Sequence, residues 1–75
     1  MKRIIFSAAW CAQCTALKES LRTAQIDFEE VNVDTDEGAA VAQQNAVRGL
    51  PTTLIFQGEE LIKTIVGLKP VSEYL

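Results

Sequence analysis

The chain has 75 residues, enough for one small domain with a thin core, because chains of this length bury only about 60% of their unfolded surface. Hydrophobic residues make up 48% and charged residues 23%, with four Gly and two Pro, which excludes a disordered or low-complexity chain. A net charge of −3 without a basic cluster argues against nucleic-acid and anionic-membrane partners. We therefore expect a single domain over residues 1–75 that acts as a monomer.

The amino-terminal residues resemble a secretion signal only superficially. A charged start is followed by Ile4, Ile5 and Phe6, but Ser7 soon interrupts the apolar run. No apolar stretch approaches the roughly 20 residues that span a bilayer. Two cysteines are too few for a small secreted disulfide scaffold. We therefore expect a cytoplasmic protein, in which a cysteine pair usually has a chemical task.

The first half of the chain alternates between strand and helix patterns. Residues 3–7 form a short apolar run whose length favours a buried strand. Residues 12–24 predict an amphipathic helix, since apolar residues recur there at spacings of three and four: Cys14, Leu17, Leu21 and Ala24. Residues 28–34 predict a second strand, although their alternation is imperfect.

The second half predicts a helix, a hairpin and a short terminal helix. Thr35 and Asp36 suit a helix N-cap, and the alanines that follow favour a helix over 36–45. Two β-rich runs, 52–56 and 61–66, flank a turn-like segment and predict an antiparallel hairpin. Gly67 ends the last strand, and Pro70 suits the first position of a helix over 71–75.

This element order limits the topology. A strand, a helix and a second strand form a right-handed crossover, which makes the two strands parallel. The hairpin adds two antiparallel strands. We therefore predict an α/β fold in the order β-α-β-α-β-β-α, with a four-stranded mixed sheet covered by helices.

The two cysteines lie at the start of the predicted helix that follows the first strand. Unpaired N–H groups and the positive end of the helix dipole at that point stabilise a thiolate and lower its pKa. Cys11 is therefore the predicted nucleophile. Cys14, three residues on, lies on the same helix face and can attack a mixed disulfide at Cys11. We interpret it as the resolving thiol.

Three other interpretations of this pair stay open. A mononuclear metal site needs more ligands than two Cys and no His supply, so no metal is expected. A cluster shared between two chains would have enough thiolates, as in some glutaredoxins. A purely structural disulfide would close so small a loop that it would stabilise the fold little.

Four motifs together resemble a thioredoxin. They are Trp-Cys-x-x-Cys at 10–14, Val-Asn-Val-Asp at 31–34, Arg-Gly-Leu-Pro-Thr at 48–52, and Val66-Gly67. Full-length thioredoxins have a further amino-terminal strand and helix, so in size the chain is closer to glutaredoxins and to the small redoxins that donate hydrogen to ribonucleotide reductase. Gln13 and the segment 67–70 are similar to the latter group.

The resemblance implies a thioredoxin-like fold and a set of substrate contacts. Leu50-Pro51 is then a cis peptide beside the cysteine pair, with the Leu50 backbone free to pair with an extended substrate segment. Trp10 shields and contacts the site, and Gly67 gives a partner backbone access to Cys11. A trans proline opening an edge strand, an indole that only covers apolar surface and a glycine that only ends a strand are the alternatives. The predicted substrate-binding residues are Trp10, Leu50, Pro51, Thr52 and Gly67.

The sequence departs from thioredoxins at positions that affect the chemistry. Thioredoxins keep a buried Asp, paired with a Lys on the neighbouring strand, that helps proton transfer from the resolving thiol. Ile5 and Glu30 stand at those positions here, so that route is absent and the resolving step relies on water or on Glu30. Gln13 replaces a proline that influences the redox potential, which the sequence therefore leaves undetermined.

Glutathione binding is less well supported. Glutaredoxins hold its carboxylates with basic residues and a Gly-Gly-x-Asp-like turn, whereas this chain has Gly-Leu-Lys-Pro at 67–70. Arg48 and Lys69 could meet a carboxylate, but we interpret both as solvated surface charges, and Lys18 likewise.

The predicted function is a thiol-disulfide oxidoreductase that reduces protein disulfides by two-cysteine exchange. The resemblance implies no bound cofactor, regeneration by a flavin-containing thioredoxin reductase that uses NADPH, and ribonucleotide reductase as one client. The alternatives are a glutathione-dependent glutaredoxin and a non-catalytic thioredoxin-like binding module.

Overall fold

The computed structural model describes all of residues 1–75. Its elements follow the predicted order of strand, helix, strand, helix, hairpin and terminal helix. They are β1 (Lys2–Ser7), α1 (Ala12–Thr23), β2 (Glu29–Asn32), α2 (Asp36–Gln44), β3 (Thr52–Gln57), β4 (Glu60–Val66) and the 3-10 helix η1 (Val71–Tyr74).

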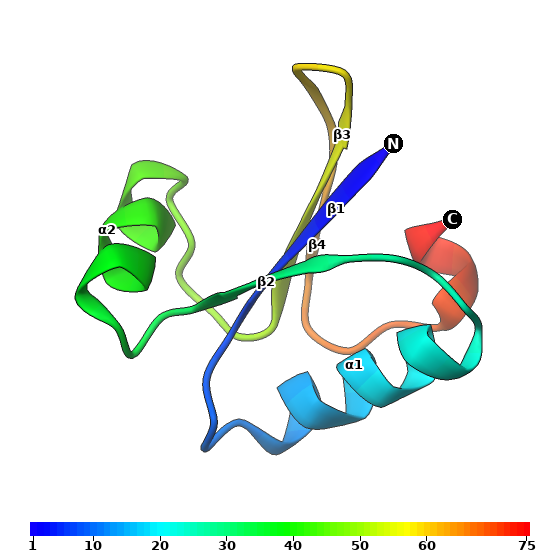
Figure 1. Ribbon diagram of the computed structural model, residues 1–75, viewed down its shortest axis with the longest axis horizontal. Coiled ribbons are helices and arrows are strands. Elements are labelled where there is room, and N and C mark those ends of the chain that lie inside the picture. Colours follow the sequence, from blue (N-terminus) through cyan, green and yellow to red (C-terminus); the bar gives the residue numbers. More distant parts are fainter.

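The four strands form one mixed sheet in the order β2-β1-β3-β4. β1 and β2 are parallel, and both β1–β3 and β3–β4 are antiparallel, as the crossover and the hairpin predicted. The helices α1 and η1 lie on one side of this sheet and α2 lies on the other (Figure 1). The predicted α/β fold with a four-stranded mixed sheet is confirmed.

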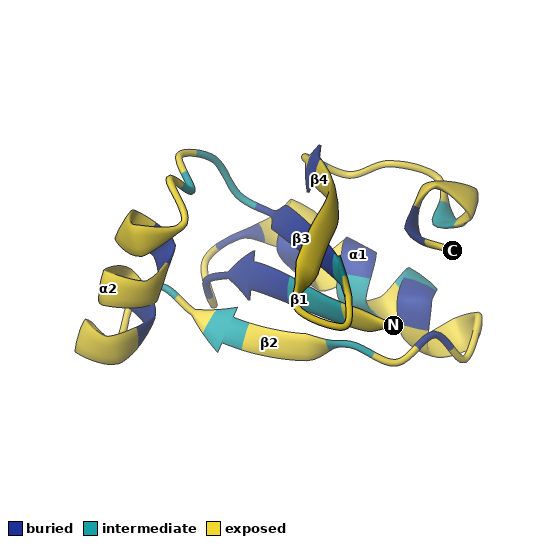
Figure 2. Cartoon of the chain, turned by 90° about the horizontal axis from the view of Figure 1, so that it is seen from above, coloured by how far each residue is buried: buried dark blue, intermediate teal, exposed yellow.

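The larger part of the core lies between α1, η1 and the sheet. Alternate residues of β1, β3 and β4 point toward α1, and the inward side chains of that helix meet them. Burial is concentrated in the two central strands and on the inner sides of the helices (Figure 2). This cluster contains Ile5, Leu17, Leu21, Ile26, Ile55, Ile65 and Tyr74.

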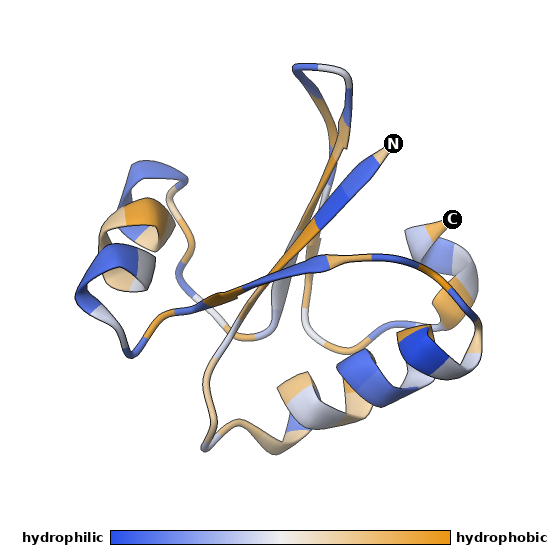
Figure 3. Ribbon diagram, in the orientation of Figure 1, coloured by the Kyte–Doolittle hydropathy of each residue, from blue (hydrophilic) through white to orange (hydrophobic).

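A smaller core lies on the opposite face, under α2. Phe6 and Leu54 point to this side and pack with Ala42 of α2. Much of the central strands is hydrophobic, whereas the turn between β3 and β4 carries hydrophilic residues (Figure 3). Gly38 lets α2 approach the end of β2, since a Cβ at that position would clash with the Asn32 carbonyl oxygen.

Three details differ from the sequence prediction. β2 covers only 29–32, because its partner β1 ends at Ser7, which pairs with Asn32. Beyond this pair the β2 chain turns, and the Asn32 side chain accepts the Asp34 N–H. Ala24 is an exposed C-cap and not part of the buried helix stripe. The terminal segment 71–74 is a 3-10 helix. Pro70 is its N-cap, one position before the place predicted for this proline. So short a segment favours the tighter 3-10 turn.

None of the helices combines the length and the apolar composition of a membrane span. No group of three or more His, Cys, Asp or Glu side chains is arranged to hold a metal ion.

Candidate active site

The cysteine pair forms a disulfide at the amino-terminal end of α1. Cys11 is the N-cap of this helix, and its sulfur accepts the backbone N–H of Cys14 at 3.1 Å. The two Cα atoms are 5.3 Å apart. Cys11 retains a little exposure, whereas Cys14 is completely buried. Cys11 is therefore the sulfur that a partner can reach, and its thiolate would lie at the positive end of the helix dipole.

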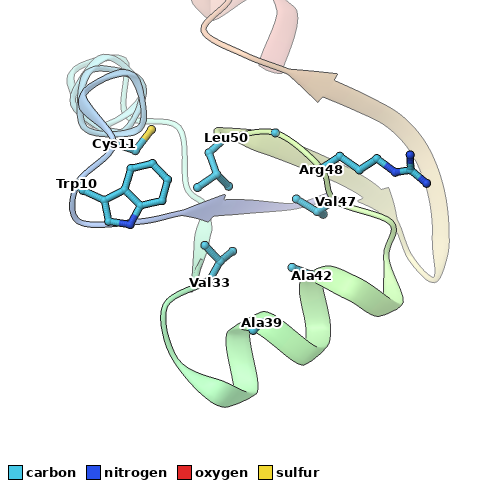
Figure 4. A pocket seen from close by; sticks show the side chains of 9 residues that line it. Trp10, Cys11, Val33, Ala39, Ala42, Val47, Arg48 and Leu50 are labelled. Atoms are coloured by element: carbon cyan, nitrogen blue, oxygen red, sulfur yellow. The ribbon is translucent and has the colours of Figure 1, made fainter.

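An apolar groove of about 450 Å³ begins at Cys11 and runs between the loop before β3 and α2. Most of its lining residues are hydrophobic. Cys11 and Leu50 lie toward one end, and Ala39 and Ala42 project into it from α2 (Figure 4). Its lining consists of Trp10, Cys11, Val33, Ala39, Ala42, Val47, Arg48, Gly49 and Leu50.

Two predicted substrate-binding residues line this groove. The Trp10 side chain is 71% exposed, and its indole N–H donates to Asp34 at 3.2 Å. That bond fixes an exposed aromatic ring beside Cys11 (Figure 4). Leu50 is half-buried and packs against the cysteines. Both present apolar surface next to the reachable sulfur.

The other three predicted residues form the framework behind the groove. Leu50-Pro51 is a cis peptide, as the resemblance implied. Pro51 is buried, and its carbonyl accepts the Gly67 N–H at 2.8 Å. Thr52 is also buried, and its hydroxyl donates to the Gly49 carbonyl at 2.5 Å. Gly67 has a φ of +89°, and a Cβ there would meet only open space. Its positive φ accounts for glycine at this position.

A charged network lies on the α1 side of the sheet. The Lys18 ammonium is 2.5 Å from Oε2 of Glu30, and the same oxygen accepts the hydroxyl of buried Ser7 at 2.7 Å. The bond from Lys18, and next the bond from Ser7, lower the pKa of the Glu30 carboxyl below its ordinary value. The interpretation of Lys18 as a solvated surface charge is wrong, because its side chain is only 16% exposed and is paired.

The other basic residues near the site remain at the surface. Arg48 lines the groove but is exposed and has no salt bridge. Lys69 is exposed as well, in the segment after β4. Neither side chain is held in place to bind a carboxylate.

Sequence reasoning missed several residues that form the groove. Val33 follows a strand and Val47 lies in a loop. Ala42 indicates only a helix, because alanine favours helices in general. Their common signal is an apolar side chain in or just after β2 or α2, since Val33 and Val47 follow these elements and Ala42 lies within α2. That signal could not show that the crossover brings these segments to Cys11.

Comparison with known proteins places the chain in a family. The family model described as Thioredoxin matches residues 3–74. The chain belongs to the thioredoxin family. Thioredoxin of Streptomyces clavuligerus is 36% identical over an alignment of 75 positions, and the alignment covers 93% of this chain and 68% of that protein. Thioredoxin 1 of Nostoc is 33% identical over 69 residues, with 87% of this chain and 64% of that protein covered. The chain thus spans about two thirds of the length of these curated relatives.

Two solved structures show the same fold with greater coverage. The glutaredoxin-like protein NrdH-redoxin from Escherichia coli has a TM-score of 0.73 and 29% identity, covering 96% of this chain and 90% of that one. Thioredoxin 1 from Thermosipho africanus has a TM-score of 0.80 and 27% identity, covering 99% and 85%. Membership of the thioredoxin family, together with the Cys11–Cys14 disulfide, supports a protein-disulfide reductase.

Proposed function

We propose that this protein is a dithiol electron carrier that reduces disulfides in client proteins through Cys11 and Cys14. The observation that carries the proposal is the disulfide at the start of α1, in which Cys11 keeps a little exposure at the edge of the groove and Cys14 is fully buried. The reachable position of Cys11 suits attack on a large substrate, and the buried position of Cys14 suits an intramolecular second step. The two sulfurs themselves carry the electron pair, so the exchange needs no bound cofactor.

The proposed reduction consists of two successive thiol-disulfide exchanges. The Cys11 thiolate attacks one sulfur of a client disulfide, and the other client sulfur leaves as a thiolate. The Cys14 thiolate then attacks Sγ of Cys11, so that the client disulfide is reduced by two electrons and the cysteine pair is oxidised. Backbone N–H groups at the start of α1 would stabilise the Cys11 thiolate. The bond from the Cys14 N–H to the Cys11 Sγ of the disulfide supports this assignment.

The groove provides a place for the client chain. A segment on either side of the client cysteine can lay an apolar side chain between Trp10, Leu50 and Ala42. The fixed orientation of Trp10 and the half-buried Leu50 support this assignment. Pro51, Thr52 and Gly67 act by holding Leu50 and the following strand in position.

Regeneration by a thioredoxin reductase, with electrons from NADPH, completes the proposed cycle. It is supported by similarity to NrdH-redoxin, a glutaredoxin-like protein described by its thioredoxin-like activity profile. Ribonucleotide reductase is the proposed client, because Gln13 and the segment 67–70 resemble the small redoxins that donate hydrogen to that enzyme. The reducing direction fits the cytoplasmic location expected from the cysteine content.

The test compares two regenerating systems in parallel. NADPH oxidation is followed with insulin as the protein disulfide, using either thioredoxin reductase or glutathione with glutathione reductase. We expect rapid turnover with thioredoxin reductase alone, because the chain belongs to the thioredoxin family and neither Arg48 nor Lys69 is held in place to bind the carboxylates of glutathione. Turnover with glutathione alone would overturn the assigned reductant, and no turnover in either mixture would favour a non-catalytic binding module. Cys11→Ser abolishes turnover if the proposal is correct.

A further inference from the structure

The resolving step requires a thiolate at a place that disfavours one. Cys14 has no exposed surface, and it packs against Ala8, Cys11 and partly buried Val33 and Leu50. None of these neighbours carries a charge. A thiol buried among apolar groups retains its proton more strongly than one in water. A positive charge nearby would lower this cost and speed attack by Cys14 at neutral pH.

Lys18 follows Cys14 by one helical turn on the same face of α1. Side chains four residues apart in a helix have Cβ atoms about 5–6 Å apart, and long helical side chains lean toward the amino-terminal end. The Lys18 stem therefore leads back over the turn that contains Cys14. Its side chain is only 16% exposed, which is low for a lysine.

Glu30 and Ser7 hold this ammonium in place. Glu30 pairs with Ile5 in the parallel register of β1 and β2, which puts its side chain on the α1 side of the sheet. Its Oε2 atom receives both the Lys18 ammonium and the hydroxyl of buried Ser7. Ala8, the residue after Ser7, packs directly on the two cysteines. Through Ser7, the network is thus joined to the segment after β1 that covers the two cysteines.

The other charges around the site are committed elsewhere or exposed. Asp34 accepts the indole N–H of Trp10. Arg22 lies one turn beyond Lys18, and its positive charge helps to lower the pKa of Glu30. Its guanidinium lies over the Phe28 ring. Glu19, Arg48 and Lys69 are exposed. The β3 strand that flanks β1 brings no charged side chain. This leaves Lys18, whose side chain is 16% exposed, and its partner Glu30, 37% exposed, as the ion pair that joins α1 to β2.

We propose that Lys18, oriented by Glu30 and Ser7, is a positioning residue whose ammonium stabilises the Cys14 thiolate during the resolving step. This inference rests on the two-cysteine exchange proposed above. In that step a bond forms between Cys14 Sγ and Cys11 Sγ, and the bond from Cys11 to the client sulfur breaks. The client sulfur leaves with the electron pair, and the proton from Cys14 passes to solvent. The ionised state of Glu30, favoured by its lowered pKa, keeps Lys18 in place.

Two substitutions separate this role from a structural one because their effects should be unequal. Lys18→Met removes the positive charge and leaves the Glu30 carboxylate without its partner. Glu30→Gln keeps the ammonium and an amide oxygen that can still accept from Lys18 and Ser7. Both substitutions break the same ion pair, so a purely structural role would make them slow the reaction equally.

The experiment uses the reduced protein and the aromatic disulfide dithiobis(nitrobenzoate), whose released thiolate is coloured. Attack by Cys11 releases a first equivalent in a concentration-dependent phase. Expulsion by Cys14 releases a second equivalent in a first-order phase, which Cys14→Ser lacks. Lys63→Met is a matched control, because Lys63 is also paired with a glutamate, Glu73, but on the hairpin side of the molecule. Stopped-flow absorbance across the pH range then measures each phase separately.

We expect Lys18→Met to slow the second phase about tenfold at neutral pH and to raise its pH midpoint by about one unit, with the first phase nearly unchanged. Lys18→Arg should restore the rate, and Glu30→Gln should slow the second phase less than Lys18→Met does. An unchanged second phase in Lys18→Met, or equal slowing by Lys18→Met and Glu30→Gln, would overturn the inference. Absence of a second phase in the unsubstituted protein would instead contradict the two-cysteine mechanism itself.

Discussion

Tyr74 connects the carboxyl-terminal helix to the framework of the site. Its side chain is completely buried, and its hydroxyl donates to the Gly67 carbonyl at 3.2 Å and accepts the Lys69 N–H at 3.3 Å. Gly67 in turn donates to Pro51 at 2.8 Å. Tyr74→Phe removes only the hydroxyl and keeps the ring in the core. The substitution therefore isolates the contribution of two hydrogen bonds to stability.

The expected cost is about 1 kcal/mol. A typical hydrogen bond contributes about 0.5–1.5 kcal/mol to the free energy of unfolding. Both bonds here are long, and the groups they release can reach water, because Lys69 is exposed and Gly67 is half-buried. For a domain of this size, 1 kcal/mol corresponds to a melting temperature lower by about 4–8 °C. Urea unfolding followed by tryptophan fluorescence measures the difference directly.

The pH dependence provides an internal check on the same residue. Burial, and less strongly the charge of Glu73, raises the pKa of Tyr74 above its ordinary value of 10.0. Between that value and the raised one, the folded chain retains a proton that the unfolded chain loses, so stability falls as pH rises. The advantage over Tyr74→Phe should therefore shrink above about pH 10. Equal stability of the two proteins at neutral pH, or an advantage that grows in alkali, would refute the reasoning.

Three other substitutions test separate parts of the fold. Thr53→Val should stabilise the protein by up to about 1 kcal/mol, because the buried Thr53 hydroxyl lies near the Tyr74 hydroxyl but makes no hydrogen bond of ordinary geometry, and a lower urea midpoint would contradict this. Leu17→Ala should cost about 3–5 kcal/mol in chemical unfolding, because Leu17 is fully buried in the α1 core, and a loss below about 1 kcal/mol would show that the core is placed incorrectly. Glu30→Gln should make stability less dependent on pH in acid. Because the pKa of Glu30 is lowered in the folded chain, its carboxylate contributes stability above pH 4.5, and this stability is lost as the pH falls through the lowered pKa. The same loss of stability in acid with and without the substitution would exclude this contribution.

The local features of this protein could be predicted from sequence. Cys11 and Cys14 are found at a boundary between an apolar run and an amphipathic pattern, and both patterns depend on neighbouring residues alone. The hairpin is equally local, since its strands are separated by a short turn. The resemblance added the cis peptide at Leu50-Pro51, which no periodicity indicates.

The contacts between distant segments could not be predicted in the same way. The bond from Ser7 to Glu30 depends on the register of two parallel strands joined by a helix. Lys18 looks like any solvated lysine until that register places a carboxylate beside it. Trp10 and Asp34 meet for a similar reason, because each follows the end of one of those two strands. Pattern analysis identifies faces, but it does not determine which residues on those faces meet.

The most direct test of the central claim is to trap the reaction halfway. Cys14→Ser and Cys11→Ser variants are each incubated with a protein disulfide, and covalent adducts are separated on a non-reducing gel and identified by mass. We predict that Cys14→Ser accumulates a mixed disulfide through Cys11, because the resolving thiol is absent, and that Cys11→Ser forms none, because Cys14 is buried. Adducts through Cys14, or efficient turnover by either variant, would contradict the account.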